Sequence, residues 1–312
     1  RLLPADVGFV QVGPPDAAGT CSLGIGAEYV ADAVRHTSTL IAEVNRQMPD
    51  TVGTPRIPLS RFAAVIETDR PLAEAPERAP DPVDRAIAAR VASLVDDGDT
   101  LQLGVGSLPS AVFDALSGHA DLGVHSGMIS DAVARLVDKG VITGARKEID
   151  PGVVVTGAAL GSRDLYGRIP ALPVEFRPAS YTHAPATLSA LRSLFAINSA
   201  LEVDLSGQVN AESAGGRYVG AVGGQADFSH AATTTGKWSV IALRSTARGA
   251  STLVPATTGG VVSTARSDVD VVVTEHGIAH LRGRDLAERR RRLIAVADPE
   301  HRESLERTGG TA

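Results

Sequence analysis

The 312-residue chain has one cysteine, two methionines and one tryptophan, and aromatic residues make up only 4% of it. The lone Cys21 excludes a disulfide within the chain and is typical of the reducing cytoplasm, where we expect this protein. Basic residues are not in excess: the net charge is -6, so no broad basic face is available and we expect no nucleic-acid partner. No apolar run reaches the roughly 20 residues of a membrane span, so we expect no membrane partner.

Short apolar runs alternate with amphipathic helical patterns, which predicts an α/β fold. Hydrophobic residues make up 43% of the chain and charged residues 21%, and the length allows two domains. Ile87, Val91 and Leu94 recur at spacings of four and three, as one buried helix face requires. Predicted strands cover 7–12, 39–44, 63–66, 100–105, 153–156, 240–243 and 269–273, and predicted helices cover 84–95, 108–116, 129–139 and 286–296.

A proline-rich segment from Pro71 to Pro82, with alanines and acidic residues between the prolines, predicts an extended linker. We therefore divide the chain into a first domain at 1–75, a linker at 76–83 and a second domain at 84–312.

The two predicted domains share a weak internal repeat. An apolar strand with an Asp-x-x-Gly turn occurs at 6–19 and at 196–207, and a strand containing Ile-Ala follows later, at 40–44 and 240–243. Two related α/β domains are therefore expected. The first predicted strand follows almost directly on Arg1, so we expect the first domain to lack its natural N-terminal portion.

A glycine-rich loop contains Gly220, Gly223 and Gly224 and is followed by Gln225. Glycine lets backbone N–H groups approach a ligand closely, and a run of such groups can hold a phosphate or stabilise an oxyanion. A plain connecting loop is the alternative interpretation.

Six separated segments, in the same order along the chain, resemble the acetyl-CoA hydrolase/transferase family of class I CoA transferases, the group that contains 4-hydroxybutyrate CoA-transferase. The resemblance implies two open-sheet domains of the NagB/RpiA-like CoA-transferase type. It also implies coenzyme A as a substrate, with no permanently bound cofactor and no metal. The segments are 41–45, 101–106, 121–126, 197–207, 223–228 and 273–279.

The resemblance further implies a reaction. A glutamate attacks an acyl-CoA thioester, CoA then forms a glutamyl-CoA thioester, and a second carboxylate takes over the CoA. The loop 220–224 would supply the oxyanion hole. Gly104 and Gly106 precede a predicted helix whose N-terminus could accept a CoA phosphate or a carboxylate, although a simple strand-to-helix turn is the alternative. Asn198 and Gln225 belong to the expected CoA-binding or oxyanion residues.

The chain departs from the family pattern at two positions. The family's nucleophilic glutamate corresponds to Gly127, which has no side chain to acylate. An asparagine in a Tyr-x-Asn-x-Pro-like context corresponds to His183. The two-step mechanism therefore needs another residue, or water, as the attacking group.

Three candidates for that role follow from the sequence. Glu275 ends a predicted strand, where α/β proteins place functional groups, or it caps a turn there. His125 and His183 could act as general bases on water, since histidine titrates near neutral pH, or they are structural.

We expect an acyl-CoA:carboxylate CoA-transferase or an acetyl-CoA hydrolase that acts on a short-chain acyl-CoA, and a homo-oligomer. The alternative is a degenerate, non-catalytic binder of CoA or acyl-CoA, which Gly127 favours. A dinucleotide-binding module is disfavoured, because no Gly-x-Gly-x-x-Gly follows a strand with an acidic residue about 20 positions on.

Overall fold

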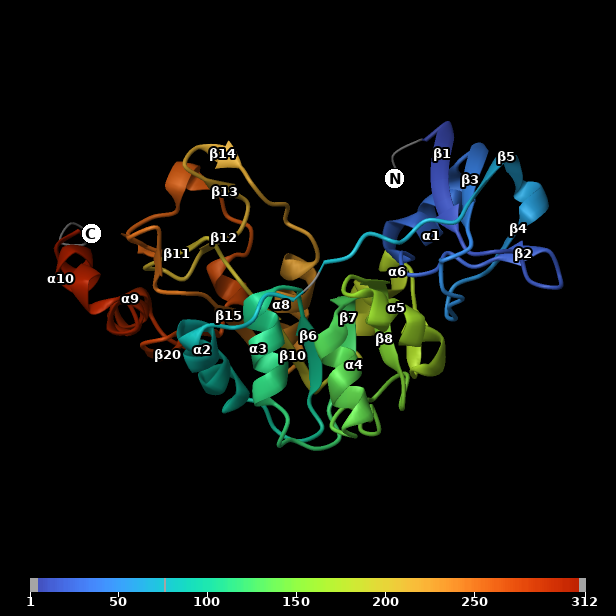
Figure 1. Ribbon diagram of the computed structural model, residues 1–312. Coiled ribbons are helices and arrows are strands. Elements are labelled where there is room, and N and C mark those ends of the chain that lie inside the picture. Colours follow the sequence, from blue (N-terminus) through green and yellow to red (C-terminus); the bar gives the residue numbers. More distant parts are fainter. Residues whose placement is uncertain (1–4, 76, 309–312) are drawn as a thin grey trace.

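The computed structural model describes residues 5–75 and 77–308 and contains two α/β units of unequal size (Figure 1). Each unit is built on an open sheet whose neighbouring strands are mostly parallel. The predicted fold class, α/β with two open-sheet domains, is confirmed.

The smaller, N-terminal unit is a three-stranded parallel sheet in the order β1-β3-β5. Side chains alternate across β1: Val10 and Val12 are buried, while Phe9 is 79% exposed. Cys21 is buried as a small core residue. The elements of the unit are β1 (Val7–Val12), β2 (Thr20–Cys21), α1 (Glu28–His36), β3 (Thr39–Asn45), β4 (Ile57–Pro58), the 3-10 helix η1 (Leu59–Arg61) and β5 (Phe62–Thr68).

The larger unit contains an eight-stranded sheet in the order β20-β19-β15-β10-β6-β7-β8-β9, in which only β20 is antiparallel to its neighbour. Parallel strands buried on both faces are near-continuous apolar runs, as in β10 and β19. The strands of this sheet are β6 (Thr100–Leu103), β7 (Gly123–Ile129), β8 (Val154–Ala159), β9 (Val174–Phe176), β10 (Leu194–Asn198), β15 (Trp238–Ala242), β19 (Val271–Thr274) and β20 (Gly277–His280).

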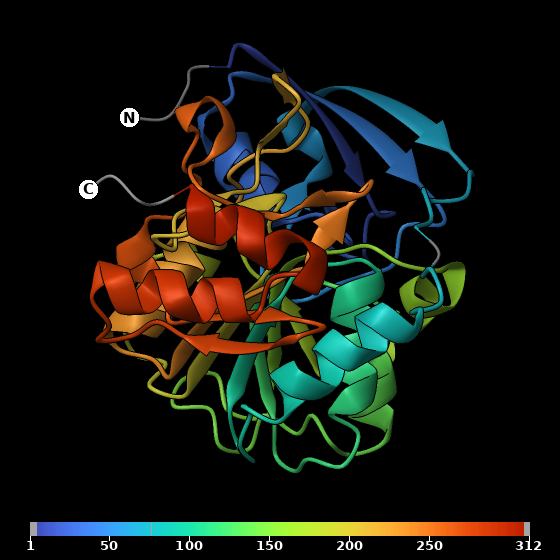
Figure 2. The same ribbon diagram turned by 90° about the vertical axis from the view of Figure 1, so that its left-hand side faces the viewer.

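Both faces of the large sheet are covered by helices. Phe195 and Ile197 of β10 belong to the main core on one face, and Leu194 and Ala196 pack with Phe228 of α8 on the other. The helices α2, α3 and α4 lie side by side over the first of these faces (Figures 1 and 2). The helices are α2 (Pro82–Ala92), α3 (Ser107–Ala115), α4 (Asp131–Asp138), α5 (Arg163–Arg168), α6 (Ala179–Thr182), α7 (Pro185–Leu188), α8 (Gln225–Thr234), α9 (Leu286–Ala295) and α10 (Pro299–Arg307).

The larger unit also contains short strands and 3-10 helices, which lie in the chain between β10 and β19 and directly after α5. They are β11 (Glu202–Asp204), β12 (Val209–Asn210), β13 (Ser213–Ala214), β14 (Arg217–Tyr218), β16 (Thr246–Ala247), β17 (Ala250–Ser251), β18 (Leu253–Val254), η2 (Ile169–Ala171), η3 (Thr258–Gly260) and η4 (Arg266–Asp268). No helix within 5–75 or 77–308 has the length and apolar character needed to cross a membrane.

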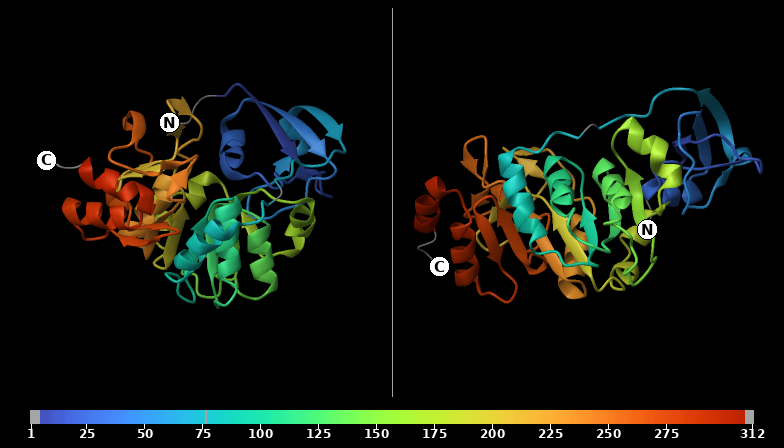
Figure 3. Two further views of the ribbon diagram at one scale, coloured as in Figure 1. Left: turned by 60° about the vertical axis from the view of Figure 1, so that its left-hand side comes forward. Right: turned by 60° about the horizontal axis from the view of Figure 1, so that its bottom comes forward.

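The two units meet at the β8–β9 side of the large sheet. Ala27 N donates to Gly157 O at 2.9 Å, and Phe176 N donates to Val52 O at 2.8 Å. The chain then returns over the larger unit in an extended stretch that leads to α2 (Figure 1). Figure 3 shows the β1–β5 unit at one end of the molecule and α9 and α10 at the other.

Most predicted element boundaries differ from the structure by a few residues, and two of these differences have a clear local cause. Helix α2 begins at Pro82, inside the predicted linker, because the Asp81 carboxylate caps it by accepting from Val83 N and Asp84 N. The predicted helix at 129–139 starts later, since Ile129 is the last residue of β7. The internal repeat has a structural counterpart: β1-β3-β5 and β10-β15-β19 are both parallel triplets in chain order.

Candidate active site

The carboxyl ends of neighbouring parallel strands bring three of the predicted site segments to one edge of the large sheet. Gly104 and Gly106 follow β6, Gly127 lies in β7, and Asn198 ends β10. Because β10, β6 and β7 are adjacent in the sheet, these segments lie side by side.

A cavity of about 460 Å³ lies at this edge and joins both glycine-rich segments. Its lining includes Gly104, Gly106, Asn198 and Gln225. Gly106 has φ 129° and ψ -177°, a conformation that side chains rarely adopt, and it directly precedes α3. The backbone N–H groups of Ser107 and Leu108, in the first turn of α3, therefore lie at the cavity wall, which suits an anion.

The Asn198 side chain is held in place by a reciprocal amide pair with Gln102 of β6. Asn198 Nδ2 donates to Gln102 Oε1, and Gln102 Nε2 donates to Asn198 Oδ1, both at 3.2 Å. The pair fixes the Asn198 amide at the cavity wall, and each of the four amide atoms has a hydrogen-bond partner.

The loop 220–224 leads into α8 and packs against His183. A Cβ atom at Gly224 would lie 2.2 Å from His183 Nε2, so the ring fits only because residue 224 is glycine. Gly223 has φ 55° and faces open space, with nothing within 4 Å of its Cβ position. A Cβ at Gly220 would lie 2.7 Å from Ala211 O. The loop is thus packed against Ala211 at its start and against His183 at its end, and the residue between them, Gly223, faces open space.

His183 lies between the glycine loop and β7. A Cβ atom at Gly127 would lie 3.3 Å from His183 Nε2, while His183 Nδ1 shares a 2.8 Å hydrogen bond with Thr182 Oγ1. Burial lowers the pKa of His183, although nearby Asp227 opposes the shift. Gly127 and His183 are therefore in contact, and burial favours the neutral form of the imidazole.

Sequence reasoning missed Glu28, whose carboxylate also reaches Gly127. Glu28 Oε1 lies 4.0 Å from the Cβ position of residue 127, and burial raises the pKa of Glu28. Glu28 begins α1 of the smaller unit, and no motif in the sequence pairs that helix with β7. Only the docking of the two units brings them together.

His125 lies on β7, fully buried, and not at the cavity. Its Nε2 donates to Thr182 O at 3.1 Å, and within the described residues its Nδ1 has no hydrogen-bond partner. Burial lowers the pKa of His125 to about 4. This placement favours the structural alternative for His125 over that of a general base.

The burial of His125 predicts a loss of stability in acid. The unfolded chain takes up this proton near pH 6.5 and the folded chain only near pH 4, so the free energy of unfolding falls as the pH drops between these values. We expect a decrease of about 2 kcal/mol between pH 7 and pH 5 in urea unfolding. His125→Gln should reduce the decrease, whereas His36→Gln, at an exposed position, should not. An equal decrease in both variants would contradict the assignment.

Glu275 lies far from Gly127 and His183. It follows β19, which is four strands from β7, or about 19 Å at the usual strand spacing. Its carboxylate accepts from Ser245 N at 2.9 Å and from Ser245 Oγ at 2.7 Å. Glu43 is similarly engaged: hydrogen bonds from Arg70 and Thr68 lower the pKa of Glu43 to about 2. Both carboxylates are engaged in local hydrogen bonds, and this favours the structural interpretation of Glu275.

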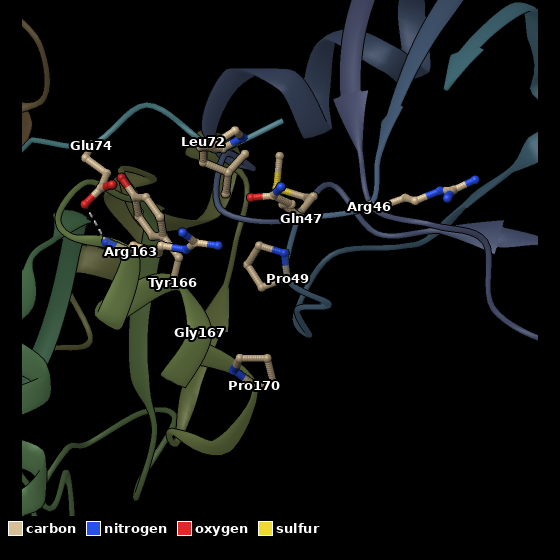
Figure 4. Close-up of a pocket in the computed structure, with 11 residues that line it drawn as sticks. Arg46, Gln47, Pro49, Leu72, Glu74, Arg163, Tyr166, Gly167 and Pro170 are labelled. Atoms are coloured by element: carbon tan, nitrogen blue, oxygen red, sulfur yellow. Dashed lines mark hydrogen bonds between the residues drawn. The ribbon is translucent and has the colours of Figure 1, made fainter. Parts of the chain in front are cut away.

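A second cavity, of about 350 Å³, lies between the two units (Figure 4). Tyr166 of α5 closes one side and donates from its hydroxyl to Ala73 O at 2.9 Å, and Glu74 accepts from Arg163 N at 2.9 Å. This cavity contains none of the predicted site residues.

Comparison with known proteins identifies the family. Residues 161–308 match the acetyl-CoA hydrolase/transferase C-terminal domain. The chain is 42% identical over 310 residues to the 4-hydroxybutyrate coenzyme A transferase of Clostridium kluyveri, covering 98% of this chain and 72% of that protein. The chain belongs to the acetyl-CoA hydrolase/transferase family. It is also 37% identical to a succinyl-CoA:acetate/propanoyl-CoA:succinate CoA transferase of Fasciola hepatica, over 97% of this chain and 65% of that protein.

Solved structures of family members share the fold. A crystal structure of 4-hydroxybutyrate CoA-transferase from Porphyromonas gingivalis superposes with a TM-score of 0.87 at 38% identity, covering 98% of this chain and 74% of that one. RipA from Yersinia pestis superposes with a TM-score of 0.91 at 35% identity, covering 97% and 70%. The predicted CoA-transferase-type fold of this acetyl-CoA hydrolase/transferase family member is confirmed.

Proposed function

We propose that the chain catalyses the transfer of CoA from a short-chain acyl-CoA to a second carboxylate. The observation that carries the proposal is the contact of His183 with both the glycine loop and Gly127. The loop also contributes Ala221 to the 460 Å³ cavity, while His183 lines a neighbouring cavity of about 570 Å³. The family relatives named above are CoA transferases for small carboxylic acids, which supports the same substrate class.

Each part of the site has a role in this reaction. The first turn of α3 offers N–H groups to an anionic part of CoA or to the acceptor carboxylate. The backbone N–H groups near Gly223 and Gly224 offer an oxyanion hole for the tetrahedral intermediate formed at the thioester carbon. CoA enters and leaves as a substrate.

Hydrolysis of the thioester is the second candidate reaction. His183, whose neutral form burial favours, has Nε2 3.3 Å from the Cβ position of residue 127 and could take a proton from an attacking water. A non-catalytic CoA binder is the outcome if neither reaction occurs.

One assay separates the three functions. The protein is incubated with acetyl-CoA and butyrate, and acyl-CoA species and free CoA are followed by chromatography. We expect butyryl-CoA to form. Free CoA without butyryl-CoA would identify a hydrolase, and binding of acetyl-CoA without either product would identify a binding protein.

Gly223→Val is expected to weaken acetyl-CoA binding at least about tenfold, because its side chain would fill the open space in front of the loop. Gly140→Val is the matched control: Gly140 also has positive φ and no neighbour within 4 Å of its Cβ position, but it follows α4 and is not part of the glycine loop. Calorimetric titration of both variants gives the comparison. Equal affinities would place the thioester elsewhere.

We also propose that the protein works as a cytoplasmic homo-oligomer, with the domain division given above. The expectation rests on the single buried cysteine for the compartment, and equilibrium sedimentation of the protein tests the oligomeric state.

A further inference from the structure

Two glycines lie side by side on adjacent strands next to His183. Gly127 of β7 and Gly157 of β8 fall at matching positions of a parallel pair, between Ser126↔Thr156 and Met128↔Ala158. The missing Cβ atoms leave a space that we call the glycine notch, formed by Gly127 and Gly157.

The side chain of Glu28 occupies the glycine notch. A Cβ atom at Gly157 would lie 2.6 Å from Glu28 Cγ, so the stem of Glu28 crosses β8 only because residue 157 is glycine. Glu28 Oε1 then lies 4.0 Å from the Cβ position of residue 127, which is close to the reach of a carboxylate borne by residue 127 itself. His183 Nε2 lies 3.3 Å from the same position.

The backbone and a neighbouring carboxylate hold Glu28 in place. Ala27 N donates to Gly157 O at 2.9 Å and fixes the start of α1 on β8. One turn further along α1, Asp32 accepts from Ser180 N at 3.0 Å and from Ser180 Oγ at 2.7 Å, on the helix that precedes His183.

The Glu28 carboxylate itself is not engaged. Within the described parts of the chain it accepts no hydrogen bond and forms no ion pair, unlike Glu43 and Glu275. It is half-buried, and burial raises its pKa. A partly desolvated carboxylate without hydrogen-bond donors is the form in which a carboxylate is most nucleophilic.

We propose that Glu28 is the catalytic nucleophile and supplies from α1 the carboxylate that residue 127 lacks. The inference rests on the proposed CoA transfer. A Glu28 oxygen attacks the thioester carbon, the C–S bond breaks, and CoA leaves as the thiolate, giving a mixed anhydride. The thiolate attacks Cδ of Glu28, the anhydride C–O bond breaks, and the first carboxylate leaves.

The second half-reaction reverses these steps with the acceptor. Its carboxylate attacks Cδ of the glutamyl-CoA thioester and expels the thiolate, which then attacks the acceptor's carbonyl carbon in the new anhydride. Acyl-CoA of the acceptor forms and Glu28 regains its carboxylate. No net proton or electron is exchanged.

Trapping tests this assignment in the whole natural protein. The protein is incubated with acetyl-CoA, any glutamyl thioester is reduced with borohydride, and the modified residue is found by peptide mass spectrometry. We expect the modification on Glu28. Glu28→Gln should lose the modification and at least about 10³-fold of kcat for CoA transfer, while it still binds acetyl-CoA. Glu28→Asp should keep part of the activity.

Glu303→Gln is the matched control, because Glu303 is exposed on α10 and its loss should change neither readout. A modification on another residue, or a Glu28→Gln variant with parental kcat, overturns the assignment and leaves the proposed CoA transfer intact. Absence of any CoA transfer by the parent protein overturns both.

Discussion

The double variant Glu28→Gln, Gly127→Glu is expected to regain CoA transfer that Glu28→Gln alone has lost. The exchange moves the carboxylate from α1 to β7 and keeps it in the glycine notch. Residue 127 lies in a strand and is not among the positive-φ residues, so glutamate fits its backbone. We expect kcat to rise roughly 10²-fold above that of Glu28→Gln, short of full recovery because a Cβ at residue 127 lies only 3.2 Å from His183 Cε1.

The control for this exchange is Glu28→Gln, Gly127→Gln, which has the same bulk at residue 127 but no carboxylate. It should stay as inactive as Glu28→Gln. The single variant Gly127→Glu, which keeps Glu28, should show a smaller rise in kcat over the parent protein than the double variant shows over Glu28→Gln. Two carboxylates in one notch raise each other's pKa, so that one of them stays protonated. If the double variant with glutamate and the control with glutamine have equal kcat, the glycine notch is not where the chemistry occurs.

Gly157→Ala is expected to have the second large effect. The added Cβ would lie 2.6 Å from Glu28 Cγ and 2.9 Å from Gly127 O, so the Glu28 side chain must move. A displacement of about 1 Å at a reacting group costs roughly 10²-fold in rate, and we expect that loss in kcat. Forcing a methyl group into this packing also costs about 1–3 kcal/mol of stability.

Gly167→Ala is its matched control, because Gly167 lies in α5 with nothing within 4 Å of its Cβ position. Steady-state kinetics and urea unfolding of both variants give the comparison. Full activity of a folded Gly157→Ala protein would show that Glu28 does not need its present position.

Much of the fold could be predicted from the sequence, since near-continuous apolar runs mark parallel strands buried on both faces. The strand at 7–12 was predicted to the residue. The strand β7 was less evident, because His125, Ser126 and Gly127 interrupt its apolar pattern, and Ile129 was assigned to the following helix. Of these three residues only Gly127 lies at the candidate site, in contact with His183, whereas His125 and Ser126 are buried.

The candidate site could be predicted only in part. The site assignment stays a prediction: the structure places Gly104 and Gln225 on one cavity, and His183 against Gly127 and Gly224. Glu28 could not be found, because its place depends on the docking of α1 against β8 through Ala27. A carboxylate supplied across a domain contact leaves no local pattern in the sequence.

Whether Glu28 is the nucleophile is tested most directly by a crystal structure of the protein with a ketone analogue of acetyl-CoA, in which a methylene group replaces the thioester sulfur. We expect the carbonyl carbon of the analogue about 3–3.5 Å from a Glu28 carboxylate oxygen, with the carbonyl oxygen toward the N–H groups of residues 223–224. An analogue bound with that atom away from the glycine notch, for example in the cavity beside Tyr166, would contradict it.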